Sequence, residues 1–298
     1  MNRTAILAIS VLGGLLSATL SLLPLFPIPL LSSLPLFLIG LGMGLLPLYG
    51  AGIVACLLVL LLEGPLSAVE FFIFFAVGPS FLIYKSLLKR KKSSGEIVWY
   101  PSSLLLRDLT YGAGAVMLIA LGFYIYFMQD WDLQTLIKKM LVMVDPEGQL
   151  KDTEPLLVKI FPFLPGLVAF WWGVTMLLNG ALAQGLLVRF KKNLRPSPSF
   201  EDLKVPMLFL PLFGLSVILS FIGVGYLELL GKNSALIFVF PYFFIGLSLI
   251  HHWFHKTSYA TAGLTVFYFI LLLFFWPILI VILLGILKPW IEKSTSSN

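Results

Sequence analysis

The sequence predicts an all-α fold, a polytopic bundle of transmembrane helices, and two observations lead to that class. No Asp, Glu, Lys, Arg or His occurs from Thr4 to Leu62. Apolar residues make up 59% of the chain and charged residues 11%, whereas ordinary globular domains have about 25% charged residues. Because a helix rises about 1.5 Å per residue, the uncharged run can cross a hydrocarbon layer of about 30 Å more than once.

The first span is predicted from Ala5 to Leu23. The alternative is a cleavable signal peptide, but the apolar stretch is long for one. Leu23-Pro24-Leu25-Phe26 follows it in place of an Ala-x-Ala cleavage site. We therefore expect this segment to remain in the protein as a membrane helix.

Charged residues, prolines and glycines divide the rest of the apolar sequence into further segments, which predict about nine spans (eight to nine). Residues 1–190 are expected to form a six-span membrane unit, on which the three spans of residues 191–298 pack. The predicted spans are 5–23, 30–45, 47–62, 66–87, 103–127, 160–188, 205–228, 235–254 and 260–287.

Lysines and arginines set the predicted orientation, because cytoplasmic loops of membrane proteins are enriched in them. With the N-terminus in the cytoplasm, thirteen of the twenty basic residues fall in inner segments. The long outer loop, 128–159, carries more acidic residues than lysines. The chain is therefore expected in the inner (plasma) membrane of a bacterium, where α-helical spans occur, with its N-terminus inside and its C-terminus outside.

The stretch 30–62 leaves two arrangements open. One long span would carry Lys89 to Lys92 to the outer side, although basic residues concentrate in cytoplasmic loops. We therefore expect the chain to cross twice or to form a re-entrant hairpin. Two short crossings are preferred. The break is marked by Pro47 and the glycines around it, which are Gly40, Gly42, Gly44, Gly50 and Gly52.

In the outer loop, Asp130 is predicted to cap a short amphipathic helix. Such a helix lies at the outward-facing interface of the same membrane, or it forms a lid over a cavity. The interfacial arrangement is the more common. The apolar residues that recur at helical spacing are Trp131, Leu133, Leu136, Ile137, Met140 and Leu141.

Polar residues inside predicted spans are the candidate substrate-binding residues, because hydrocarbon disfavours them. Glu70 either binds a cationic group or carries a proton, or it lies close enough to the outer surface to reach water. Asn179 and Gln184 are five residues apart, so they point to different faces of the sixth span. They line a pocket or join neighbouring helices.

Two further features are candidate contact sites. Ser10, Gly14 and Ala18 recur four residues apart on the first span, and small side chains let a second helix approach closely, either from this chain or from a partner. Arg107 and Asp108 lie at the inner end of the fifth span, where anchoring is expected more than substrate contact. Adjacent helix residues do not face one another, so no mutual salt bridge is expected.

The sequence indicates no catalytic, metal or cofactor site. His251, His252 and His255 end the eighth span, but no Glu follows the first His as in zinc proteases, so contact with lipid phosphate is expected there. Neither a phosphate-binding loop nor a nucleophile–base pair is recognisable. Basic residues gather in short loops and not along a nucleic-acid groove. We expect no enzyme activity, no cofactor and no nucleic-acid partner.

Five stretches share a specific order and spacing. They are Pro35–Gly44 (PLFLIGLGMG), Trp99-Tyr100-Pro101, Asn179–Gly185 (NGALAQG), Arg195–Pro198 (RPSP) and Phe243–His251 (FFIGLSLIH). In this order they resemble the YybS-like family of uncharacterised bacterial membrane proteins, in the form seen in alphaproteobacteria. The resemblance covers nearly the whole chain.

The resemblance implies a distant similarity to the S components of energy-coupling-factor vitamin transporters. Those six-helix units capture a small molecule and dock, partly through small residues of the first helix, on a shared membrane and ATPase module. It therefore implies small-molecule binding for transport, with an ATP-driven coupling module as partner. The alternatives are a membrane scaffold or assembly factor in envelope biogenesis and, third, an intramembrane enzyme acting on lipid.

Overall fold

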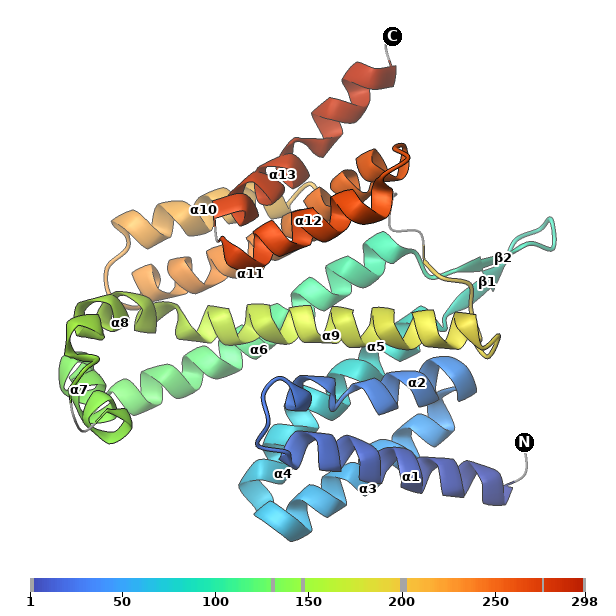
Figure 1. The fold of residues 1–298 in the computed structure, drawn as a ribbon, viewed down its shortest axis with the longest axis horizontal. Helices are drawn as coiled ribbons and strands as arrows, with labels where there is room; N and C mark the ends of the chain where they lie inside the picture. The colour runs from blue at the N-terminus through green and yellow to red at the C-terminus, as the bar shows by residue number, and fades with distance from the viewer. Residues whose placement is uncertain (1–2, 130–131, 146–147, 199–202, 275, 297–298) are drawn as a thin grey trace. The chain divides into compact units, whose positions relative to one another are not determined.

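The computed structural model describes residues 3–129, 132–145, 148–198, 203–274 and 276–296. Helices make up nearly all of it, as the composition predicts, and one short β-hairpin interrupts them (Figure 1). The elements are α1 (Arg3–Leu22), η1 (Ile28–Leu31), α2 (Leu34–Met43), α3 (Leu45–Glu63), α4 (Pro65–Phe71), η2 (Phe72–Val77), α5 (Gly78–Ser86), β1 (Lys89–Lys91), β2 (Ile97–Trp99), α6 (Ser102–Met128), α7 (Leu133–Val144), η3 (Lys151–Thr153), α8 (Glu154–Ile160), η4 (Phe161–Phe163), α9 (Leu164–Arg189), α10 (Phe209–Ile222), α11 (Tyr226–His255), α12 (Ala260–Leu273) and α13 (Trp276–Ser296).

Helix packing divides the chain into two units. Unit 1 consists of Met1–Leu109 and Trp172–Asp202, and unit 2 of Thr110–Trp171 and Leu203–Asn298. The boundaries therefore fall inside α6 and α9. This grouping by packing differs from the division at residue 190 that the sequence predicts.

Six helical segments of the described residues are long and apolar enough to cross a membrane, and the bent pair α12–α13 is a seventh candidate. The multi-pass helical class is thus confirmed, whereas the predicted count of nine is not. Two predicted spans appear as the shorter helices Ile28–Met43 and Phe209–Ile222, and the predicted span 260–287 is bent by 119°. The six segments are Arg3–Leu22, Leu45–Glu63, Pro65–Ser86, Ser102–Met128, Glu154–Arg189 and Tyr226–His255.

The predicted break within 30–62 lies at Gly44. This residue has a φ of +96°, a backbone conformation that glycine adopts without steric penalty, and it separates α2 from α3. Among the marked residues, Pro47 lies in the first turn of α3, where a missing N–H is tolerated. The chain is therefore divided at one glycine and not along the whole glycine-rich stretch.

In unit 1, the small residues of α1 pack against α3. Ser10 donates a hydrogen bond to the carbonyl of Pro47 (3.1 Å), and a Cβ on Gly14 would lie 2.6 Å from the carbonyl oxygen of Ala51. Ala18 is fully buried. The predicted stripe is therefore occupied by internal packing, and a partner would have to displace α3 to reach it.

In unit 2, α11 is the central helix, and its residues from Phe240 to Ile250 are almost all buried. A Cβ on Gly246 would collide with the carbonyl of Val281, and one on Gly285 with the carbonyl of Tyr242. Backbone therefore lies against backbone where α13 crosses α11, the close approach that small residues permit between membrane helices.

The amphipathic helix of the predicted outer loop is α7. Asp132 caps it by accepting a hydrogen bond from the backbone N–H of Thr135 (3.0 Å). Asp130, the predicted cap, and Trp131 lie outside the described residues. Ile137 is buried in unit 2, and Lys138 pairs with Glu154 of α8 at 3.7 Å.

Candidate functional site

The most irregular part of unit 1 is a break in the helical segment Pro65–Ser86. Residues Phe72–Val77 form a π-helix, and Pro79, just beyond it, has no N–H to donate to the preceding turn. Two carbonyls of this turn accept side-chain hydrogen bonds instead. Trp172 Nε1 donates to the carbonyl of Phe74 (2.7 Å), and Ser33 Oγ donates to that of Phe75 (3.2 Å).

Asn179 of α9 lies against a second irregular turn. Its side-chain nitrogen donates to the carbonyl of Leu30 in η1 (2.7 Å) and to that of Thr175 in its own helix (2.7 Å). Ser17 of α1 donates to the carbonyl of Ser32, which follows the same turn. We call Ser32, Ser33, Trp172, Thr175 and Asn179 the polar layer of unit 1.

Asn179 and the Phe75 carbonyl lie about half a hydrocarbon layer, measured along their helices, from the basic residues that end α9 and α5. Asn179 precedes Arg189 by ten residues, and Phe75 precedes Lys85 by ten. At about 1.5 Å per residue, each distance is about 15 Å, half of a hydrocarbon layer of about 30 Å. Irregular backbone at such depth occurs where it is buried in protein or lines a cavity.

Two buried atoms of the polar layer have no hydrogen-bond partner among the described residues. They are Oδ1 of Asn179 and Oγ of Ser32, and both residues are at most 1% exposed. Leaving such an atom unpaired costs about 1–3 kcal/mol. A small molecule or water could satisfy both atoms, because the amide oxygen accepts a hydrogen bond and the serine hydroxyl donates or accepts one.

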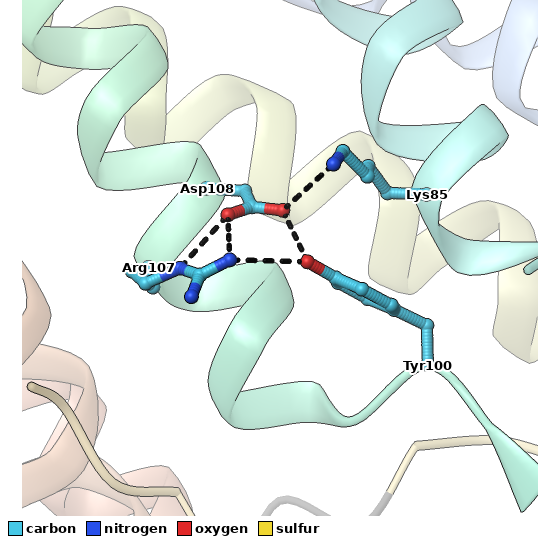
Figure 2. A network of polar contacts seen from close by, with 4 residues as sticks. All are labelled: Lys85, Tyr100, Arg107 and Asp108. Carbon is cyan, nitrogen blue, oxygen red and sulfur yellow. Dashed lines mark hydrogen bonds and ion pairs between the residues drawn. The ribbon is translucent and has the colours of Figure 1, made fainter.

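A second cluster of polar side chains surrounds Asp108 in unit 1 and includes Lys85 (Figure 2). Tyr100 donates to Oδ2 of Asp108 (2.7 Å), and Arg107 donates to Oδ1 through Nε (3.0 Å) and a terminal nitrogen (2.7 Å). Lys85 Nζ lies 3.9 Å from Oδ2. The expectation that Arg107 and Asp108 make no mutual salt bridge is therefore wrong, because the flexible Arg107 side chain folds back along the helix.

The Tyr100 hydroxyl remains a donor in this network. Burial raises the pKa of Tyr100, and the adjacent Asp108 carboxylate raises it further, while Arg107 acts in the opposite sense. The phenol is therefore protonated at neutral pH and supplies a hydrogen to the carboxylate.

Arg195 joins the connecting segments near this network. It is 4% exposed and donates to the carbonyls of Ser86 (2.7 Å) and Tyr100 (3.3 Å). Burial lowers the pKa of its guanidinium. Gln184, a predicted substrate-binding residue, donates to the carbonyl of Arg195 (3.0 Å). Gln184 thus supports the loop after α9 and is not part of the polar layer.

Glu70, the third predicted substrate-binding residue, is exposed on α4, two residues before the π-helix begins. The structure therefore brings Asn179 to the polar layer but not Glu70 or Gln184. His251 contacts the hydroxyl of Tyr268 at 2.7 Å in unit 2, and its ring lies 6.3 Å from that of His255. Among the described residues, no group of three or more His, Cys, Asp or Glu side chains could hold a metal ion.

Several residues of the polar layer were not predicted from the sequence. Ser32, Ser33 and Trp172 carry no charge, and serine and tryptophan are common in membrane helices. The available signal was Gly78-Pro79 inside an apolar span, because a mid-span proline frees carbonyls that polar side chains must then satisfy. Asn233 of unit 2 was also missed, although it is fully buried.

The long apolar helices define a multi-pass α-helical membrane protein. The chain belongs to the family described as predicted membrane protein (DUF2232), whose match spans residues 5–287. No curated protein matches the chain, and no solved structure does.

Proposed function

We propose that this protein binds a small, neutral, polar molecule at the polar layer of unit 1, as a non-enzymatic membrane protein of transport type. The observation that carries the proposal is that two buried atoms, Asn179 Oδ1 and Ser32 Oγ, have no hydrogen-bond partner among the described residues. Transporters commonly place their substrate sites near the bilayer midplane, at helices that are interrupted there.

The chemistry of the layer indicates the class of ligand. An amide oxygen accepts hydrogen bonds and a serine hydroxyl both donates and accepts them, so the ligand would offer an N–H or O–H group. None of the five residues of the polar layer is charged. A charged ligand would therefore lack a counter-charge at this depth, and hydrocarbon disfavours it.

The resemblance to S components through the YybS-like family is consistent with this function. On this proposal the protein lies in a bacterial inner membrane with its N-terminus in the cytoplasm. It depends on a partner such as an ATP-driven coupling module for energy, since its sequence has no recognisable phosphate-binding loop.

The test is recovery of the bound molecule. The full chain would be purified in mild detergent, denatured, and the released small molecules identified by mass spectrometry. We expect a compound that wild type releases and that is lost from Asn179→Leu and reduced in Ser32→Ala. Ser216→Ala is the matched control, because Ser216 is also buried but lies in unit 2, where its hydroxyl bonds the carbonyl of Leu212 in its own helix (2.8 Å).

Equal recovery from wild type and Asn179→Leu would contradict the proposed site. If wild type releases no compound under any mild condition, water fills the layer and the binding function is excluded. Crosslinking to envelope proteins that are not transporter modules would then support the scaffold alternative.

A further inference from the structure

The surface around Lys85 combines an apolar helix face with two cations. Four large side chains between residues 77 and 88 are exposed at helical spacing. They are Val77 (44% exposed), Phe81 (42%), Tyr84 (45%) and Leu88 (37%). In a membrane protein such a face lies against lipid chains. Lys85 stands beside its end, one turn after Phe81.

The position of Lys85 agrees with headgroup depth. It lies in the last turn of α5, at the end of the apolar segment Pro65–Ser86, where the long basic side chains of membrane helices reach the headgroups. Trp99 and Tyr100 accompany it in unit 1, and such aromatic residues concentrate at membrane interfaces.

Lys85 is held in place but is weakly paired. Its Nζ lies 5.5 Å from the ring centre of Phe81 and 5.7 Å from that of Tyr100. Its distance of 3.9 Å to Asp108 exceeds hydrogen-bond length, and the ammonium makes no hydrogen bond to any described residue. Arg107 already binds the Asp108 carboxylate through two nitrogens.

Among the described residues, two cations share one carboxylate at this surface. Lys85 and Arg107 both contact Asp108, and their side chains are 28% and 30% exposed. We propose that Lys85 and Arg107 bind the phosphate of an anionic phospholipid of the surrounding bilayer, whose acyl chain lies along Val77, Phe81 and Tyr84. Basic sites between membrane helices at headgroup level recognise anionic lipids in this way.

The test uses full-length protein in nanodiscs of phosphatidylcholine and phosphatidylglycerol, with retained lipid counted by native mass spectrometry. We expect wild type to retain phosphatidylglycerol in preference to phosphatidylcholine. Lys85→Gln should lower that preference about fivefold, the factor that corresponds to about 1 kcal/mol for one basic residue at a membrane surface.

Lys192→Gln is the matched control, because Lys192 is exposed in the same unit and the variant loses the same charge. Melting temperatures in pure phosphatidylcholine establish that both variants fold. Equal losses in the two variants would reduce the effect to general surface charge and overturn the site. Full competition by soluble glycerol phosphate would overturn the acyl-chain contact, because a free phosphate would then suffice.

Discussion

Among the described residues, each unit of this protein has one asparagine that is almost completely buried, and the two side chains are hydrogen-bonded differently. In unit 2, Asn233 accepts from the backbone N–H of Gly166 (2.6 Å) and donates to the carbonyls of Pro162 (2.9 Å) and Leu229 (2.7 Å). In unit 1, Asn179 donates twice, but its oxygen has no partner among the described residues.

The comparison teaches how to separate a packing residue from a binding residue inside a membrane protein. Asn233 has a protein partner for its oxygen and for its nitrogen, so helix contact explains it fully. Asn179 retains an unused acceptor while its nitrogen bonds the carbonyl of Leu30 in the irregular η1 turn. An unsatisfied polar atom requires a further explanation, and a bound molecule provides one.

The largest expected effect lies in the α11–α13 contact of unit 2. Gly285→Ala should lower the free energy of unfolding by about 3 kcal/mol, because the new Cβ meets the rigid carbonyl of Tyr242 and no rotamer change relieves it. Thermal unfolding in detergent measures this. Gly122→Ala is the control, since no atom lies within 4 Å of a Cβ there, and its stability should be unchanged or slightly higher.

The second prediction tests the two asparagines directly. Asn233→Ala should lower the free energy of unfolding by about 2 kcal/mol, because it leaves the Gly166 N–H and the Pro162 carbonyl unpaired. Asn179→Ala should lower it by about 1 kcal/mol, since one inter-helix bond is lost and one unsatisfied oxygen is removed. Equal losses, measured by the same unfolding assay, would remove the distinction between them.

The third prediction concerns the network of Figure 2. Tyr100→Phe should lower the free energy of unfolding by about 1 kcal/mol at neutral pH, through loss of the bond to Asp108. The raised pKa of Tyr100 means that this contribution is fully present below the unfolded pKa of about 10. It is lost as pH rises through the folded pKa. A variant whose difference from wild type persists at high pH would contradict this assignment.

The smallest effect is expected at Glu70. Glu70→Gln should change the free energy of unfolding by less than about 0.5 kcal/mol, because the side chain is exposed. Recovery of the small molecule should also equal that of wild type. A loss of recovery in this variant would return Glu70 to the binding site and extend the site beyond the polar layer.

The sequence predicted some elements well because their signals are local. The uncharged run predicted membrane helices, and the apolar spacing predicted the helix that begins at Leu133. Asn179 was identified because an amide inside an apolar span is conspicuous. The predicted count of nine spans was not confirmed where glycine and proline breaks shortened or bent a helix, since composition shows an apolar run but not its direction.

What the sequence determined by itself is the solvent and the class, because hydrocarbon disfavours charged groups and a long run without them is visible in the composition. Only the tertiary structure decided what each polar residue does. Ser10 and Gly14 meet α3, Gln184 supports a loop, and Asn179 keeps an unused oxygen. Hydrogen bonds act over about 3 Å, so their partners, often far apart along the chain, appear only once the helices are packed.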